Sequence, residues 1–275
     1  MLVVPHITQP IDRMNLRRLF LADFTTDALR LLLAGPSPVV VLVPVGSVEP
    51  HGPHLPLATD TLIGEAAAKR AAEMLESRSV RALVGPSIPY GVTRFADGFA
   101  GAISVTESAL TGFLHAVVTG YLAAGFAHVC LVNNHLEPAH DEAVRRAIAE
   151  ILTGRASVAS PLTKRFARTL SAEFKSGACH AGRYETSLVL TAAPDLVDRV
   201  RASSLPSLDT SLSAGIRDGK SSFLAMGLTD AYTGAPAEGS AEEGRALTDK
   251  LAEMIVTEVE EGLLAKMAAV HETGA

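Results

Sequence analysis

The segment VVVLVPVGSVEPHGPHLPLATD, residues 39–60, decides the fold class and points to a site. It begins with a short, continuous apolar run, which is typical of a strand that is covered on both faces. Two carboxylates and two imidazoles follow within twelve residues, from Glu49, His51, His54 and Asp60. Four potential metal ligands at the point where a buried strand surfaces, on a backbone restricted by Gly and Pro, predict a metal site.

Strand and helix patterns alternate along the chain. Strands are predicted at 39–46, at the start of 80–91 and at 128–134, and helices at 25–35, 60–77, 106–126 and 138–152. This order predicts an α/β fold: a doubly wound, mostly parallel sheet with helices on both faces, in three α/β/α layers. We expect residues 1–275 to form a single domain.

The composition limits the partners. There are 24 Lys and Arg against 30 Asp and Glu, a net charge of −6, and no basic run that could follow a phosphate backbone. The apolar stretch 31–46 is broken by Gly and Pro before reaching the ~20 residues of a membrane-spanning helix. We therefore expect a cytoplasmic protein without nucleic-acid or membrane partners. Cys130 and Cys179 are too few for a disulfide framework and are predicted to be reduced packing residues.

A second loop carries ligand-type side chains. Asn134, His135 and Glu137 come at the end of the strand-like run at 128–134. In open α/β sheets, ligands bind beyond the carboxyl ends of the strands. We therefore expect this loop and the loop of Glu49 to meet at one rim of the sheet.

A third loop, CHAGRYETS at 179–187, adds His180 and Glu185. It precedes an apolar helix whose start Thr186 or Ser187 could define. Glu185 could be a ligand or an ordinary carboxylate in the first turn of that helix.

Three such loops offer more ligands than one closed tetrahedral zinc site needs, which favours a binuclear site. Two ions about 3.5–4 Å apart commonly share a bridging carboxylate, and Asp60 is the expected bridge. The alternative is a salt-bridged cluster, but burying that much negative charge without a cation is costly. His54 could orient a ligand or serve packing only. The remaining histidines are expected at the surface or hydrogen-bonded in the core: His6, His115, His128, His140 and His271.

Three motifs resemble those of the creatininase (creatinine amidohydrolase) family. They are the leading motif, the Asn-X-His motif and the His-Gly/Ala-Gly…Glu-Thr-Ser motif, seen here as VPVGSVEPHGPHLPLATDT (43–61), VNNHLEPAH (132–140) and HAGRYETSLVL (180–190). GFAGAISV (98–105) resembles the family's Pro-Gly-Thr loop, with alanines in place of the usual residues. The match runs from 39 to about 200 in the family order.

The resemblance implies a subunit with two divalent ions, zinc with manganese or a second zinc or iron, in a homo-oligomer that is usually a hexamer. By that likeness, the ligands of one ion are Glu49, Asp60 and His135, and those of the other are His51, Asp60 and Glu137. Many relatives have a small residue in place of Glu137 and rely on the carboxylate that matches Glu185. The last ligand of the second ion therefore stays open between Glu137 and Glu185.

Such a pair of ions lowers the pKa of water toward ~7 and polarises a carbonyl, which makes attack on an amide feasible. By family likeness, His180 moves a proton to the leaving nitrogen, and Glu137 or Glu185 is the alternative general base. We therefore predict metal-dependent hydrolysis of a non-peptide, cyclic amide, such as creatinine or a related small molecule.

Several features argue against creatinine itself. Creatininases close aromatic residues, including tryptophans, over their ligand, whereas this chain has no Trp and has Leu136 where an aromatic residue is expected. Related family activities are deformylation of an opened pyrimidine, cleavage of a peptide end in mycofactocin maturation, and ring opening of a cyclic sugar ketone. A metal-containing protein without turnover, serving assembly, is a further alternative. The segment 202–240 could be a pocket wall, a subunit contact or a plain surface loop.

Overall fold

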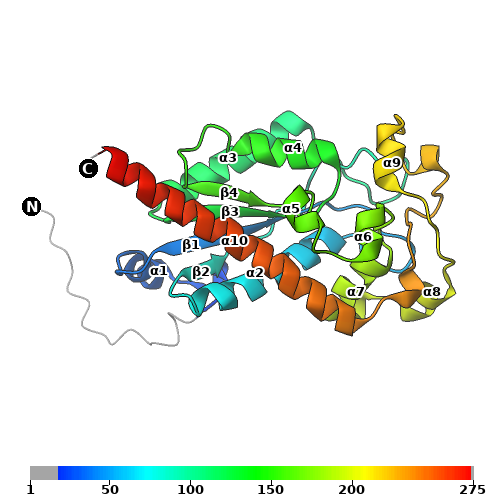
Figure 1. The fold of residues 1–275 in the computed structure, drawn as a ribbon, viewed down its shortest axis with the longest axis horizontal. Helices are drawn as coiled ribbons and strands as arrows, with labels where there is room; N and C mark the ends of the chain where they lie inside the picture. Colours follow the sequence, from blue (N-terminus) through cyan, green and yellow to red (C-terminus); the bar gives the residue numbers. More distant parts are fainter. Residues whose placement is uncertain (1–17, 274–275) are drawn as a thin grey trace, which may run out of the picture.

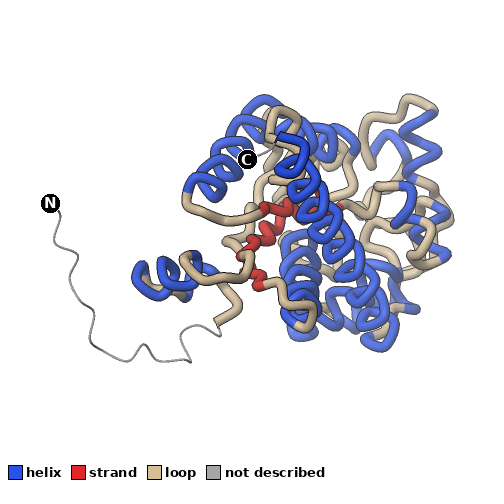
Figure 2. Tube along the Cα trace, turned by 60° about the vertical axis from the view of Figure 1, so that its left-hand side comes forward, coloured by secondary structure: helices blue, strands red, loops and turns tan. Residues whose placement is uncertain are grey.

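The computed structural model describes residues 18–273. Within them lies a four-stranded parallel sheet with the strand order β2-β1-β3-β4, seen between the helices in Figure 2. The strands are β1 (Val39–Val45), β2 (Arg81–Val84), β3 (His128–Asn133) and β4 (Ala156–Ala159). The predicted parallel sheet is confirmed, and β4 is a strand that the sequence did not predict.

Helices cover both faces of the sheet, which confirms the α/β/α layers. Val41 and Val43 of β1 point into one core, and Val40 and Leu42 point into the other. The first face is covered by α1 (Thr26–Leu33), α3 (Glu107–Ala123) and α4 (Pro138–Ala147). The opposite face is covered by α2 (Thr59–Glu76), α7 (Arg183–Ala192) and α10 (Ala241–Thr273).

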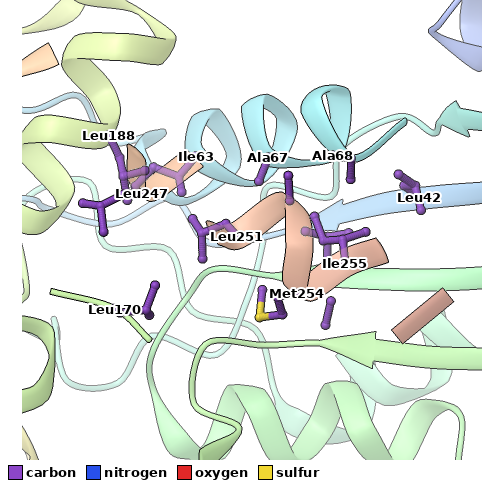
Figure 3. Close-up of a cluster of buried hydrophobic side chains, with 14 of the residues drawn as sticks. Leu42, Ile63, Ala67, Ala68, Leu170, Leu188, Leu247, Leu251, Met254 and Ile255 are labelled. Carbon is purple, nitrogen blue, oxygen red and sulfur yellow. The ribbon is translucent and has the colours of Figure 1, made fainter. Parts of the chain in front are cut away.

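The longest helix, α10, runs diagonally across the sheet in Figure 1. Its Leu251 and Ile255 pack against α2, where Ala67 and Ala68 leave room for a close approach, as Figure 3 shows. Burying a leucine or isoleucine side chain stabilises the fold by roughly 1.5–3 kcal/mol, so this contact is a main source of stability on that face.

Two helices begin where a threonine side chain caps them. The side chains of Thr25 and Thr106 accept hydrogen bonds from the third residue after them, at 3.3 Å and 3.2 Å, and α1 and α3 begin there as predicted. The helix predicted at 138–152 is shorter, because the chain leaves helical geometry at Ile148 (φ −111°, ψ 1°). The prediction that Thr186 or Ser187 defines the start of α7 is wrong, because the helix already begins at Arg183.

The strand order places a topological switch point between β1 and β3. The chain leaves β1 through α2 on one face to reach β2, and leaves β2 through α3 on the other face to reach β3. A crevice therefore opens beyond the carboxyl ends of β1 and β3, which is where ligands bind in such sheets. Both candidate ligand loops start there.

Apart from η2, which precedes α1, the remaining short elements lie between β4 and α10 in the chain, and in Figure 1 the elements from α6 to α9 gather on the right-hand side. They are η2 (Leu21–Asp23), α5 (Lys164–Ala167), α6 (Ala172–Ser176), η3 (Pro194–Leu196), α8 (Arg199–Ser204), α9 (Leu212–Arg217), η4 (Leu224–Met226) and η5 (Pro236–Glu238). Among residues 18–273, no helix is long and apolar enough to cross a membrane. The single domain over 1–275 stays a prediction.

Candidate metal centre

The end of β1 and the start of α2 lie against each other, and this contact places Asp60. A Cβ atom on Gly46 would lie 2.7 Å from the Cβ of Asp60, so only glycine lets the two backbones come this close. The backbone N–H of Ser47 donates to Asp60 Oδ2 (3.1 Å), which holds the carboxylate over the end of the strand.

The first candidate group consists of Glu49, Asp60 and His135, all buried. His135 Nδ1 lies 3.1 Å from Glu49 Oε1 and 3.1 Å from Asp60 Oδ2. The other ring nitrogen, Nε2, donates to the carbonyl oxygen of Val92 (2.7 Å). A backbone carbonyl that accepts from one imidazole nitrogen and turns the other inward is the usual arrangement for a metal-binding histidine.

The second candidate group is built around His51, whose Nδ1 donates to the carbonyl of Glu49 (3.2 Å). Its Nε2 lies 3.2 Å from Asp60 Oδ1, 3.5 Å from Glu185 Oε2 and 3.8 Å from Glu49 Oε1. Although it is buried, this nitrogen forms no hydrogen bond within the described part of the chain. Oxygen atoms therefore surround it in a geometry that suits a shared cation better than a hydrogen bond.

Glu185 and Glu137 take different positions. Glu185 lies in the first turn of α7, accepts from the backbone N–H of Ala181 (2.6 Å), and belongs to a candidate group with His51 and Asp60. Ala181 has a left-handed backbone (φ 51°), which is strained for a residue with a side chain, and this conformation accompanies the contact.

The Glu137 carboxylate instead accepts from the backbone N–H groups of Arg94 (3.2 Å) and Phe95 (3.1 Å). It lines the pocket but belongs to no candidate metal group among the described residues. The geometry thus brings Glu185, not Glu137, to His51 and Asp60.

His180 forms a third candidate metal group with Glu49 and His51. Its Nε2 is 3.0 Å from the carbonyl oxygen of Pro50, and a carbonyl can only accept, so this nitrogen carries the proton and Nδ1 keeps its lone pair. The ring lies 4.5 Å from that of His51 and stacks on Phe223 at 4.4 Å. Burial, and then the charge of His51, lowers the pKa of His180 to about 4, so the side chain is neutral at pH 7.

The buried carboxylates of the cluster need positive charge beside them. Burial alone would raise the pKa of Glu49, but the charge of His135 outweighs it and lowers the pKa to about 2. Burial raises the pKa of Glu185 to about 7. Burial lowers the pKa of His51, yet Asp60 and Glu185 more than offset this and raise it to about 10. Three buried carboxylates with imidazole nitrogens among them form a donor set that fits zinc or manganese.

Other histidines support the fold. His54 Nε2 lies 2.8 Å from Thr186 Oγ1, so this side chain joins the ligand loop to α7. His140 accepts from the N–H of Val92 (3.2 Å) and packs on His135. His115 and His128 hydrogen-bond backbone carbonyls, as expected, while His6 and the side chain of His271 lie outside the described part. Both cysteines are free and buried, which confirms that prediction.

Some residues of the site were not predicted. Thr93 donates its hydroxyl to Glu49 Oε2, and the backbone N–H groups of Arg94 and Phe95 bind Glu137. Phe223 packs on both His180 and Phe95. None of these residues is a metal-ligand type placed after a strand, so the sequence carried no signal for them.

A pocket of about 710 Å³ opens above the cluster. Buried carboxylates, including Glu49 and Asp60, form its floor with His135 and His180. Apolar and basic side chains form the rest, and the segment 202–240 contributes Leu212, Ser213, Ile216, Arg217 and Phe223. This segment is therefore a pocket wall, which was one of the three expectations for it.

Comparisons with known proteins agree with the geometry. The family model described as creatinine amidohydrolase matches residues 24–259. A mycofactocin precursor peptide peptidase from Mycobacterium ulcerans (strain Agy99) is 32% identical over 226 residues, which are 80% of this chain and 84% of the relative. A creatinine amidohydrolase from Pseudomonas putida is 27% identical over 177 residues, 58% of this chain and 66% of the relative. A solved structure named "Creatininase Mn" has the same fold, with a TM-score of 0.68 at 22% identity over 90% of this chain and 99% of that chain.

Proposed function

The chain belongs to the creatininase family of hydrolases, and we propose that it is a metal-dependent enzyme that cleaves an amide bond near the end of a peptide. One observation carries the proposal. The carboxylates of Glu49, Asp60 and Glu185 meet the imidazoles of His51 and His135, and all five side chains are buried. All of them except His51 line the floor of the pocket. Such a cluster is costly to bury without cations.

We assign two divalent ions to the cluster, zinc with manganese or a second zinc or iron. Glu49, Asp60 and His135 would hold one ion, and His51, Asp60 and Glu185 would hold the other. Asp60 turns one oxygen to each imidazole, which supports its assignment as the bridge. When bound, such ions supply a water of pKa ~7 and a Lewis acid for the amide carbonyl.

The other side chains then handle protons. His180 also forms a candidate metal group with Glu49 and His51, but we assign it to proton transfer rather than to an ion. It is neutral, its Nε2–H is fixed by the carbonyl of Pro50, and its Nδ1 keeps a lone pair that can take a proton and pass it to the leaving nitrogen. Glu137 also faces the pocket, and burial raises its pKa, which suits a general base or acid. Glu185 is assigned to the metal rather than to proton transfer because it lies beside His51.

The substrate is proposed to be a peptide because a 32% identical relative that covers most of this chain is a peptide peptidase. The pocket of about 710 Å³ has room for several residues of an extended chain, and Leu136 lines it where creatininases have an aromatic residue. A non-peptide, cyclic amide such as creatinine is the second candidate, and it is supported by the Pseudomonas putida relative.

A substrate panel tests the proposal. Purified protein, loaded with Mn²⁺ or Zn²⁺, is incubated with a pool of N-acetylated peptides, with creatinine and with a formamidopyrimidine, and products are identified by mass spectrometry. We expect shortened peptides with the wild type and with Asp195→Asn, an exposed control, and none with Asp60→Asn. Turnover of creatinine alone would support the second candidate. Bound metal without any turnover would support a non-catalytic assembly protein and contradict the proposal.

Assembly and location stay predictions. A homo-oligomer, a hexamer by family resemblance, is expected and can be measured by light scattering after size-exclusion chromatography. The cytoplasmic location and the lack of nucleic-acid and membrane partners also rest on the composition alone.

A further inference from the structure

Four basic side chains line the open side of the pocket. They come from three separate helices and the residue after one of them: Lys164 in α5, Arg168 directly after it, Lys175 in α6 and Arg217 in α9. All four are exposed, whereas the histidines and carboxylates of the floor are buried. In a chain with a net charge of −6, three separate segments thus bring four positive charges to one rim.

These four side chains differ from the other cations nearby. Arg165, in the same short helix as Lys164, pairs with Glu258 and Glu261 at 2.6 Å and 2.7 Å, away from the pocket. The four rim cations form no ion pair with a carboxylate of residues 18–273. Arg217 donates its Nε to the carbonyl of Ser213 (3.1 Å), which holds its side chain along α9 at the pocket.

Acidic side chains are distributed in the opposite way. The acidic residues that line the pocket are Glu49, Asp60, Glu137 and Glu185, and all of them are buried at the floor. No acidic residue of the described chain lines the rim with the basic ones. An anion that enters the pocket therefore meets uncompensated positive charge first, which raises its local concentration.

Between rim and floor the wall is apolar. Leu136, Phe95, Phe223 and Ile216 line this part of the pocket. A ligand that reaches from the basic rim to the acidic floor therefore needs an anionic end, an apolar middle and, at the floor, the bond that reacts.

We propose that the four rim side chains bind a carboxylate of the substrate. This inference rests on the proposed function: a peptide would place its scissile amide at the floor, apolar side chains against the wall, and a carboxylate at the rim. Arg168 and Arg217 suit this task because a guanidinium can bind a carboxylate through two parallel hydrogen bonds. The carboxylate is the C-terminal group of the peptide or an Asp or Glu side chain near its end.

Affinity selection tests the inference without requiring turnover. Metal-loaded protein is mixed with an equimolar pool of N-acetylated tetrapeptides that are present as free acids and as C-terminal amides, with and without Asp or Glu. Retained peptides are quantified by mass spectrometry. The rim variant carries Gln at Lys164, Arg168, Lys175 and Arg217, and a matched control carries Gln at four exposed basic positions outside the pocket lining: Lys69, Arg199, Arg201 and Arg245.

We expect the wild type and the control variant to retain carboxylate-bearing peptides at least ten-fold better than neutral ones, and the rim variant to lose this preference. Preference for free acids over amides assigns the C-terminal carboxylate, and preference for Asp or Glu peptides assigns a side chain. Equal retention of charged and neutral peptides, no retention at all, or an unchanged preference in the rim variant overturns the inference. Cleavage of neutral peptides with equal retention would refute the inference alone. Selective retention without cleavage would refute the proposed function alone.

Discussion

Replacing Glu185 or Glu137 by glutamine will show which carboxylate completes the second metal site. Glu185 Oε2 lies 3.5 Å from His51 Nε2, while the Glu137 carboxylate is occupied by the N–H groups of Arg94 and Phe95. Glutamine keeps an oxygen that can accept from the N–H of Ala181 in place of Glu185 Oε2, so Glu185→Gln removes charge while the loop stays held. We expect Glu185→Gln to bind one of the two ions more weakly and Glu137→Gln to keep the affinity for both.

The size of the loss follows from the donor count. The second group has one donor each from His51, Asp60 and Glu185, so the substitution weakens one of three ligands. Changes to residues that merely orient a ligand cost about 10–100-fold in metal affinity, so about 100-fold, or ~2.8 kcal/mol, is a lower bound for a ligand itself. At free Mn²⁺ about 100 times the wild-type Kd, occupancy of the second site falls from about 99% to about 50%.

Equilibrium dialysis against buffered free Mn²⁺, followed by elemental analysis, measures bound metal per chain. The wild type and Glu137→Gln should bind about two ions per chain, and Glu185→Gln about 1.5. Asp60→Asn should bind fewer than 1.5, because Asp60 belongs to the candidate groups of both ions. Far-UV circular dichroism checks that each variant is folded. Loss of an ion in Glu137→Gln together with full occupancy in Glu185→Gln would refute the reasoning.

Three further predictions concern stability. Gly262→Ala should lower the free energy of unfolding in urea by about 1–3 kcal/mol, because a Cβ at this position overlaps the His128 ring. Gly120→Ala in α3, where a Cβ meets no other atom, should raise it by about 0.5–1 kcal/mol. A change of the same sign for both variants would contradict this. Glu173 accepts from the N–H groups of Tyr184 (2.7 Å) and Ala235, so Glu173→Gln should cost about 1–3 kcal/mol, and a change within about 0.5 kcal/mol would argue against it. Burial lowers the pKa of His128 below 6.5, so as the pH falls the unfolded chain binds a proton at this side chain before the folded chain does. The free energy of unfolding should therefore decrease as the pH drops below about 6.5. An NMR titration of folded protein with a His128 midpoint at or above 6.5 would disprove this.

The central strands could be predicted because both their faces are buried. β1 is a continuous apolar run and β3 is apolar from Val129 to Val132, and such short apolar segments are typical of strands that are covered on both faces. β4 spans Ala156–Ala159, with small side chains and only half of its residues buried, so it has neither an apolar run nor an alternating pattern. Its pairing with β3 is set by the sheet rather than by its own sequence.

The prediction of helices was wrong where residues make contacts with elements far away in the chain. Ser187 looked like a cap, but its hydroxyl accepts from the N–H of Ser240 (3.0 Å) and joins α7 to the start of α10. The 33-residue α10 was not predicted at all. It contains Gly244 and Gly262, which weaken a helix on their own, yet a Cβ at either position would overlap α7 or the His128 ring. Close packing between distant elements explains both failures.

The meeting of the loops after β1 and β3 could be predicted, because the carboxyl ends of these strands flank the switch point. The orientation of Glu137 could not, because it depends on N–H groups of Arg94 and Phe95, which are more than forty positions away in the chain. The basic rim could not be predicted from the sequence either, because its members are scattered over residues 164–217 and come together only in the folded chain.

The orientation of two imidazoles, those of His51 and His180, explains why the residues of the leading motif are so closely spaced. His51 and His180 each donate one ring nitrogen to a backbone carbonyl, and both carbonyls, those of Glu49 and Pro50, belong to the motif itself. The sequence Glu49-Pro50-His51 therefore supplies a carboxylate, an imidazole and the acceptors that fix two rings. A residue inserted between Glu49 and His51 would move these acceptors away from both rings, even with every ligand retained. The chemistry of this site is thus specified by backbone carbonyls as much as by side chains.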